Sequence, residues 1–291
     1  MFKLSVFTDE ISQDFERAVA VASEYRLDGV EIRSVWDKPP QQLDNRDIRE
    51  VREILKGTGL KVASIASPFF KCHLGNAEER KEHIQILERC ARLADALECS
   101  IIRGFTFWRE TPVENHWQDI LTAFAEPLTL LEKYDKTLAI ENEASTMVGT
   151  GRRLATFLGD LNADRVAAMW DPANCVYDDE DREIPFPDGY EAVKHRMRHM
   201  HLKDALRDPA KNELRCVPIG EGLVDYRAQF PALVADGYDG FVSLETHWRP
   251  TALDEEQLNR PGGAAFSKEG EYATRVCLDN LFRMLADLHL R

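Results

Sequence analysis

The sequence lacks the features that mark several common classes of protein. Its six cysteines include no CxxC pair, so we expect reduced thiols that mostly fill the core, not a thiolate metal site. No apolar run approaches the roughly 18 residues of a membrane span. The first residues, MFKLSVFTDE, show neither the charged start nor the long apolar stretch of a signal peptide. We therefore expect a cytoplasmic protein with no membrane partner.

Positive charge is also scarce. Lys and Arg number 37 against 51 Asp and Glu, which gives a net charge of -14. A surface of this sign repels phosphate backbones, so nucleic acid is not expected as a partner. A small molecule is therefore the expected substrate.

Two further absences bear on the fold. The first apolar run, Lys3 to Phe7, is followed by Thr8-Asp9-Glu10, which has no glycine and so excludes the GxGxxG loop of a dinucleotide-binding sheet. Within the 291 residues no Pro, Gly or Ser-rich stretch forms a linker. We therefore expect one domain spanning residues 1–291.

Short apolar segments alternate with helical patterns along the whole chain. Eight strands are predicted, at residues 3–7, 30–33, 60–67, 100–105, 137–142, 165–171, 197–204 and 240–245. The predicted helices lie at residues 11–25, 47–56, 78–97, 116–134, 152–161, 190–196, 226–235 and 268–288. Strands joined by helices form a parallel sheet, and eight such units predict a single (β/α)8 TIM barrel.

The last four predicted strands all end in a metal-ligating side chain. These residues are Glu141, Asp171, His201 and Glu245. In a TIM barrel the active site lies at the C-terminal ends of the strands, so the four side chains should converge. Three carboxylates and one imidazole suit one divalent ion, Mn, Mg, Co or Zn. The alternative for each carboxylate is a loop residue satisfied by backbone donors.

At these positions the sequence resembles a known family. The matching pieces are AIEN with Glu141, WDPAN with Asp171 and Asn174, HMHLKD with His201, PIGEG followed by VDY, and SLE with Glu245. They are similar to those of the sugar phosphate isomerase/epimerase group of xylose isomerase-like TIM barrels. The resemblance implies one divalent metal held by Glu141, Asp171, His201 and Glu245. It also implies Glu141 and Glu245 as the catalytic acid/base pair, and a homodimer or homotetramer.

The chemistry that the family implies is proton abstraction next to a carbonyl, which a metal assists as a Lewis acid. We therefore expect an isomerase or epimerase of a small keto-sugar or sugar acid. The alternative is a lyase of inosose dehydratase type, which shares the enolate but expels a hydroxyl group. An endonuclease of the related DNA-repair type, or a sugar-binding barrel without activity, is less favoured.

Four more residues are candidates for binding the substrate. Asn174 stands where many relatives have a histidine, and it can bond a hydroxyl but does not readily shuttle a proton. Lys203 could bind a substrate oxygen, or pair with Asp204 or a neighbouring carboxylate. Arg103 and Lys71 could hold an anionic group, or balance the acidic cluster.

Three further expectations concern the surroundings of the site. Glu31 and Arg33, two residues apart on one strand, are expected to form a buried ion pair. His199 is expected to be an interior hydrogen-bonding residue and not a ligand. The stretch at residues 249–265 is long enough to be a lid or an oligomer contact.

Overall fold

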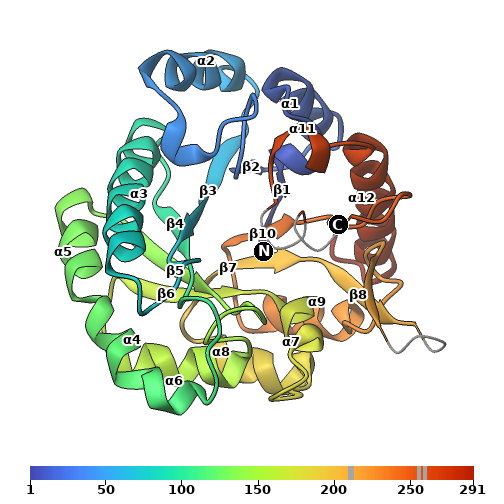
Figure 1. Cartoon of the computed structure of the whole chain (residues 1–291). Coiled ribbons are helices and arrows are strands. Elements are labelled where there is room, and N and C mark those ends of the chain that lie inside the picture. Colours follow the sequence, from blue (N-terminus) through green and yellow to red (C-terminus); the bar gives the residue numbers. More distant parts are fainter. Residues whose placement is uncertain (209–212, 254–256, 258–260) are drawn as a thin grey trace.

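The computed structural model describes residues 1–208, 213–253, 257 and 261–291. Within these residues eight strands close into a barrel in the order β1-β10-β7-β6-β5-β4-β3-β2, and every neighbouring pair is parallel. The barrel strands are β1 (Lys3–Phe7), β2 (Gly29–Ile32), β3 (Lys61–Phe69), β4 (Ile101–Gly104), β5 (Thr137–Glu141), β6 (Val166–Trp170), β7 (Met197–Leu202) and β10 (Phe241–Leu244). Figure 1 shows the ring of strands inside a ring of helices. The predicted TIM barrel is confirmed.

Helices cover the outside of the barrel, which is why its strands are nearly continuous runs of buried residues. The longer helices are α1 (Phe15–Glu24), α2 (Asn45–Leu55), α3 (Ala77–Ala96), α5 (Ala125–Tyr134), α6 (Gly151–Leu161), α9 (Tyr226–Ala235) and α12 (Gly270–Asp287). The shorter ones are α4 (Trp117–Ala123), α7 (Pro172–Tyr177), α8 (Tyr190–Val193) and α11 (Gly263–Phe266), with single turns η1 (Thr8–Glu10), η2 (Pro40–Gln42), η3 (Val113–His116) and η4 (Pro185–Gly189). Among the described helices, none combines the length and the apolar character needed to cross a membrane.

Three predicted helices differ from the structure, and one of them, predicted over residues 190–196, ends already at Val193. The helix predicted over residues 11–25 begins only at Phe15, where the Asp14 side chain accepts a hydrogen bond from the Arg17 amide. The helix predicted over residues 116–134 is broken at Phe124 into α4 and α5. Pro127 in the first turn of α5 has no amide hydrogen, and the first turn tolerates this because its amides have no partner within the helix.

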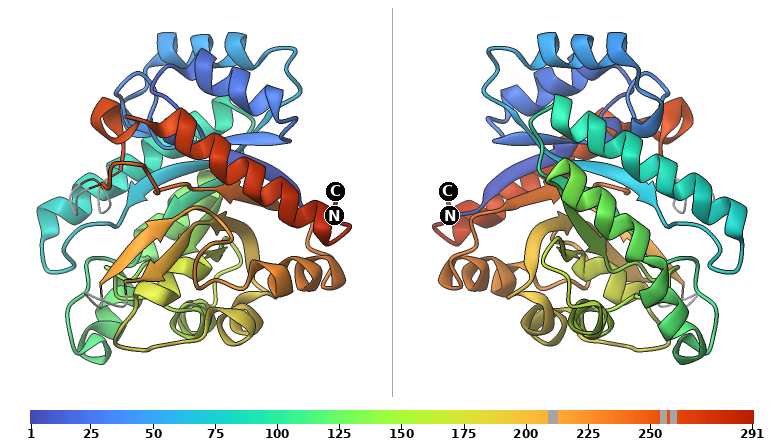
Figure 2. Two further views of the ribbon diagram at one scale, coloured as in Figure 1. Left: turned by 90° about the vertical axis from the view of Figure 1, so that its right-hand side faces the viewer. Right: turned by 90° about the vertical axis from the view of Figure 1, so that its left-hand side faces the viewer.

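The sequence did not predict the hairpin that follows β7. The strand predicted over residues 197–204 ends at Leu202, and an antiparallel hairpin follows, made of β8 (Asp204–Arg207) and β9 (Leu214–Val217). The Asp204 carboxylate accepts backbone N–H bonds from Gly220, Gly222 and Val224. A Cβ atom at Gly222 would lie 2.1 Å from Asp204 Oδ1, so this loop requires glycine there. Figure 2 shows the hairpin at the end of the molecule opposite the two termini, which lie beside each other.

The six cysteines behave as the sequence predicted. All are free thiols, and all but Cys216 are buried. Burial raises the pKa of Cys72, Cys90 and Cys99 to about 12, so these thiols are not nucleophiles at neutral pH.

Candidate metal centre

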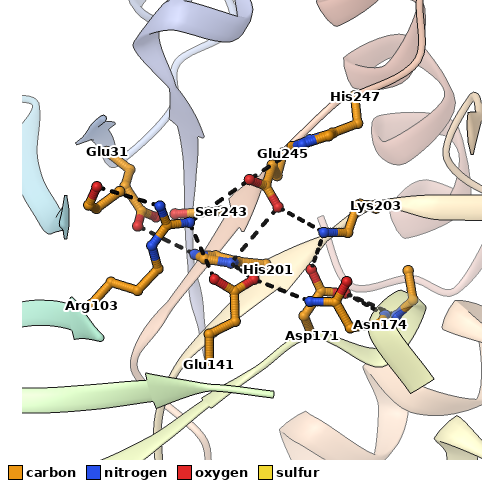
Figure 3. A network of polar contacts seen from close by, with 12 residues as sticks. Glu31, Arg103, Glu141, Asp171, Asn174, His201, Lys203, Ser243, Glu245 and His247 are labelled. Carbon is orange, nitrogen blue, oxygen red and sulfur yellow. Dashed lines mark hydrogen bonds and ion pairs between the residues drawn. The ribbon is translucent and has the colours of Figure 1, made fainter. Parts of the chain in front are cut away.

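The structure brings the four predicted ligand residues together at the C-terminal end of the barrel. Glu141 is the last residue of β5, Asp171 follows β6, His201 lies in β7, and Glu245 follows β10. Each offers a ligand atom such that all four atoms lie within 4.8 Å of one another, and all four residues are buried. Figure 3 shows their side chains pointing toward one another. The convergence of parallel strand ends accounts for this cluster.

The two side-chain oxygens of Asp171 have different roles, because one caps a helix and the other faces Lys203 in the cluster. Its Oδ1 caps α7 by accepting the amides of Ala173 (2.9 Å) and Asn174 (3.2 Å). Its Oδ2 is buried without a hydrogen bond from the described residues, although Lys203 Nζ lies 2.9 Å away as an ion partner. Burial raises the pKa of Asp171 to about 6, even though the charge of Lys203 opposes the shift. Lys203 therefore neutralises the Asp171 carboxylate only in part, and a second cation would be favourable there.

His201 has its two ring nitrogens between two carboxylates. Nδ1 lies 3.1 Å from Glu141 Oε1, and Nε2 lies 3.2 Å from Glu31 Oε1. Burial opposes protonation, but the charges of Glu31 and Glu141 outweigh it and raise the pKa of His201 to about 10. Nδ1 is thus the nitrogen that faces the other ligands, while Glu31 holds the opposite edge of the ring. Sequence reasoning did not assign Glu31 this position.

Glu31 does not pair with Arg33, so the predicted ion pair is wrong. The second oxygen of Glu31 lies 2.8 Å from Nε2 of His199, which is fully buried and also bonds Ser243. His199 is therefore an interior hydrogen-bonding residue, as predicted. The partners of Arg33 come from other elements, because its guanidinium reaches Asp9, Glu10 and Glu245.

Glu245 is held by cations on both oxygens. Arg33 donates to Oε1 at 2.6 Å, and Lys203 donates to Oε2 at 3.1 Å. Burial raises the pKa of a carboxyl group, but Lys203, His247 and Arg33 outweigh it and hold the pKa of Glu245 well below its usual range. Glu245 is therefore ionised and fixed in place.

Glu141 is held in the same way from β4 and α7. Arg103 Nη1 donates to Oε2 at 3.2 Å, and Asn174 Nδ2 donates to Oε1 at 3.3 Å. Burial is again outweighed, here by His201 and Arg103, and the pKa of Glu141 falls to about 2. Both proposed acid/base residues are thus carboxylates at neutral pH.

Asn142, the residue after Glu141, joins the ends of β5 and β6. Its Nδ2 donates to the Asp171 carbonyl at 2.8 Å, and its Oδ1 accepts the Asp171 amide at 2.9 Å. The side chain is fully buried. The AIEN motif therefore contains both a candidate ligand and the clamp that fixes a second ligand next to it.

The residues present fit a divalent cation. Three carboxylates and one imidazole form a donor set that Mn, Mg, Co or Zn can use. The pKa values of His201 and Asp171 are both raised, so the cluster favours added positive charge. Two overlapping groups of residues also bring three possible ligand atoms within 4.8 Å of one another: Glu31–His199–His201 and Glu10–Glu245–His247. Their members bond each other or Arg33 and Arg249, so they support the centre and do not form a second one.

A cavity of about 390 Å³ opens beside the cluster. Its walls include all four predicted substrate-binding residues: Lys71, Arg103, Asn174 and Lys203. Lys203 pairs with Asp171 and Glu245, not with Asp204. Lys71 lies 3.4 Å from Glu143, which also lines the cavity. Glu143 was not predicted, although it lies two residues beyond Glu141 and could have been noticed by its spacing.

A closed parallel barrel with a buried carboxylate–histidine cluster at the C-terminal strand ends defines a class of metal-dependent barrel enzymes. Comparison with protein families makes the assignment narrower. The protein-family model described as "Xylose isomerase-like TIM barrel" matches residues 19–269. The chain belongs to this family, as the sequence motifs indicated.

The curated relatives that the chain resembles include two bacterial inosose dehydratases. The protein of Geobacillus thermodenitrificans (strain NG80-2) is 24% identical over 240 residues, which cover 72% of this chain and 78% of that protein. The protein of Klebsiella pneumoniae (strain 342) is 23% identical over 260 residues, which cover 79% and 82%.

Solved structures with the same fold include sugar epimerases and metal-bound proteins. D-Psicose 3-epimerase with D-tagatose, from Clostridium cellulolyticum H10, has a TM-score of 0.74 at 15% identity and covers 99% of both chains. IOLI protein with a bound zinc atom has a TM-score of 0.74 at 17% identity and also covers 99% of both. A protein from Mycobacterium smegmatis in complex with magnesium has a TM-score of 0.67 at 18% identity, covering 97% of this chain and 98% of that one.

Proposed function

We propose that the protein is a metal-dependent lyase of inosose dehydratase type. It would remove a proton next to the carbonyl of a cyclic polyhydroxylated ketone and expel a neighbouring hydroxyl group as water. The observation that carries the proposal is the buried cluster of Glu141, Asp171, His201 and Glu245 beside a sugar-sized cavity. The inosose dehydratases among the curated relatives favour water loss over the isomerase or epimerase reaction expected from the sequence.

The four clustered residues would hold the divalent ion, which supplies Lewis-acid polarisation of the substrate carbonyl when bound. Glu141 and Glu245 approach the same nitrogen of His201, Nδ1, at 3.1 and 4.0 Å, and Figure 3 shows the two side chains reaching the cluster from different strands. Each carboxylate is ionised, so either can accept the proton, depending on which face of the substrate carries it. A ligand oxygen shared with the ion is a weaker base, so we assign the proton to the second oxygen of the glutamate concerned.

Lys203 is the group that we assign to the departing hydroxyl. Burial would lower its pKa, but Asp171 and Glu245 raise it well above the usual range, so the side chain is an ammonium. It lines the cavity between these two carboxylates. In the elimination the C–H bond gives its proton to a glutamate, a C=C bond forms and the C–O bond breaks. The Lys203 ammonium gives a proton to the departing oxygen, which leaves as water, and the proton taken by the glutamate then restores the charge of Lys203.

The test is to incubate the manganese-loaded protein with 2-keto-myo-inositol in D2O and to follow the products by NMR. The expected result is loss of water, together with the unsaturated product. The variants Glu141→Gln and Glu245→Gln should each lose activity while remaining folded. Glu16→Gln, which changes an exposed carboxylate of α1, should not. Activity retained by both of the first two variants would contradict the acid/base assignment.

Epimerisation or isomerisation is the second candidate, supported by two ionised carboxylates, Glu141 and Glu245, that reach the cluster from the ends of different strands. A proton taken by one carboxylate could be returned by the other to the opposite face. In the same experiment with ketoses, deuterium incorporation without water loss would identify this reaction. An endonuclease is less favoured, because a net charge of -14 repels the phosphate backbone of nucleic acid.

A further inference from the structure

A second cavity, of about 490 Å³, adjoins the first one at the mouth of the barrel. It lies over the loop after β2 and the start of α3, and it shares four residues with the cavity beside the metal cluster: Lys71, Arg103, Phe105 and Pro261. Each cavity lies within the size range of small-molecule sites. The four shared residues therefore form the boundary between two compartments, one that reaches the cluster and one that does not.

The outer cavity has the features of a site for an uncharged ring. Its walls include Phe105 and Trp108, which flank the Lys71 ammonium at 4.9 and 5.5 Å from their ring centres. Pro39, Pro40 and Pro68 add rigid apolar surface. Aromatic and apolar faces of this kind contact the C–H faces of sugar rings, while polar groups at the rim bond the hydroxyls.

Two polar groups on the wall have capacity for such bonds. Gln41 Oε1 is buried and accepts no hydrogen bond from the described residues. His83 Nδ1 accepts the Phe70 amide at 2.9 Å, which places the ring proton on Nε2, and burial lowers the pKa of His83 so that the ring stays neutral. The wall therefore offers one acceptor and one donor, the pair that a hydroxylated ring can use.

The charges on the wall argue against a phosphate in this cavity. Arg33 is bonded to Asp9, Glu10 and Glu245. Arg103 is paired with Glu141, and Lys71 with Glu143. Since each cation already has a carboxylate partner, the wall offers little net positive charge to an anion.

We propose that the outer cavity is a subsite for a second sugar ring, so that the substrate is a glycoside-like keto-sugar with one ring at the cluster and one at Gln41 and His83. This inference rests on the proposed function. It goes further by naming the substrate class, a two-ring keto-sugar, and Gln41 as a residue that determines specificity.

The test measures binding of unreactive glycosides to the manganese-loaded protein by calorimetry. The probes are methyl β-D-glucopyranoside, which has one ring, the two-ring compounds methyl β-cellobioside, methyl β-maltoside and methyl β-lactoside, and the 6-phosphate of the one-ring compound. At least one two-ring compound should bind about tenfold more tightly than methyl β-D-glucopyranoside, because one ring contact and one hydrogen bond together contribute on that order.

Two variants on the turn η2 locate the gain. Gln41→Trp fills the outer cavity and should remove the preference for two rings while leaving the binding of methyl β-D-glucopyranoside unchanged. Gln42→Trp changes the neighbouring residue, which is exposed, and should keep the preference. The melting temperatures of both variants report whether the fold is intact.

Three results would overturn the subsite. They are two-ring compounds that all bind no more tightly than methyl β-D-glucopyranoside, a phosphate compound that binds most tightly, and equal effects of the two tryptophan variants. Any of these, with turnover of 2-keto-myo-inositol intact, removes the subsite and keeps the proposed function. Two-ring binding without any deuterium exchange removes the proposed function and keeps the subsite. Failure of both binding and exchange removes both.

Discussion

Glu31 Oε1 lies 3.2 Å from His201 Nε2, on the edge of the ring opposite the other candidate ligands. A carboxylate in this position fixes which nitrogen carries the ring proton, and it raises the basicity of the nitrogen that faces the metal. Both residues are fully buried, so the arrangement is rigid. Glu31 thus acts on the centre through His201.

Replacing Glu31 by Gln should lower the affinity for Mn2+ by about 10- to 100-fold, the usual cost of losing such a partner. The amide offers only one acceptor to the two histidines that Glu31 bonds. Equilibrium dialysis measures the change. The control is Ser243→Ala, which removes a hydroxyl bonded to His199 but keeps the contact between Glu31 and His201. Equal losses in both variants would mean that the effect is general destabilisation.

Metal binding should release protons in a number that depends on pH. The pKa of His201 is about 10 and that of Asp171 is about 6, and both groups must lose their protons to act as ligands. Between pH 7 and 9 about one proton should leave, from His201. Below pH 6 about two should leave, and the affinity should fall more steeply as the pH falls. Calorimetry in buffers of different ionisation enthalpy counts these protons, and a constant number from pH 5 to 9 would contradict the assignment.

Asp171→Asn should abolish the stabilisation that metal gives. Bound ligand at one hundred times its Kd adds about 2.7 kcal/mol, which corresponds to a rise in Tm of about 4 °C for a chain of this length. The asparagine can still cap α7 through its side-chain oxygen, so the metal-free variant should melt no lower than the metal-free parent. Asp225→Asn, which alters the cap of α9, should keep the metal effect. Thermal melts with Mn2+ and with EDTA compare the variants.

Asn142→Ala should destabilise the barrel itself. The change leaves the buried amide and carbonyl of Asp171 without their partner, at a cost of about 2–4 kcal/mol, or a fall in Tm of about 3–6 °C. Asn280→Ala is the control, because that side chain is only half-buried and its partner Glu221 is exposed. A fall no larger than the control's would show that the clamp is dispensable.

The fold and the four clustered residues were predictable because both follow from periodicity. Alternating strands and helices define the barrel, and a polar residue at the end of each of four parallel strands must meet the others. The partners of those residues do not follow from periodicity. Glu31 bonds His199 and His201 from across the barrel, whereas proximity in sequence suggested Arg33. Such choices depend on the three-dimensional distance between side chains.

The hairpin was missed for the same reason, because it depends on contacts in three dimensions and not on a sequence pattern. The hairpin of β8 and β9 is too short to show a clear alternation, and it depends on the Asp204 carboxylate meeting Gly220 and Gly222. Residues 249–265 lie partly outside the described residues. Their role as a lid or an oligomer contact therefore stays a prediction. So does a homodimer or homotetramer.

Lys203 has a consequence for how the protein matures. Its ammonium lies 2.9 Å from Asp171 and 3.1 Å from Glu245, so the chain carries its own countercharge among carboxylates that would otherwise repel one another. Folding of the barrel need not wait for an ion. The chain can therefore complete its core first, and the divalent ion that we propose would bind to a site that is already folded.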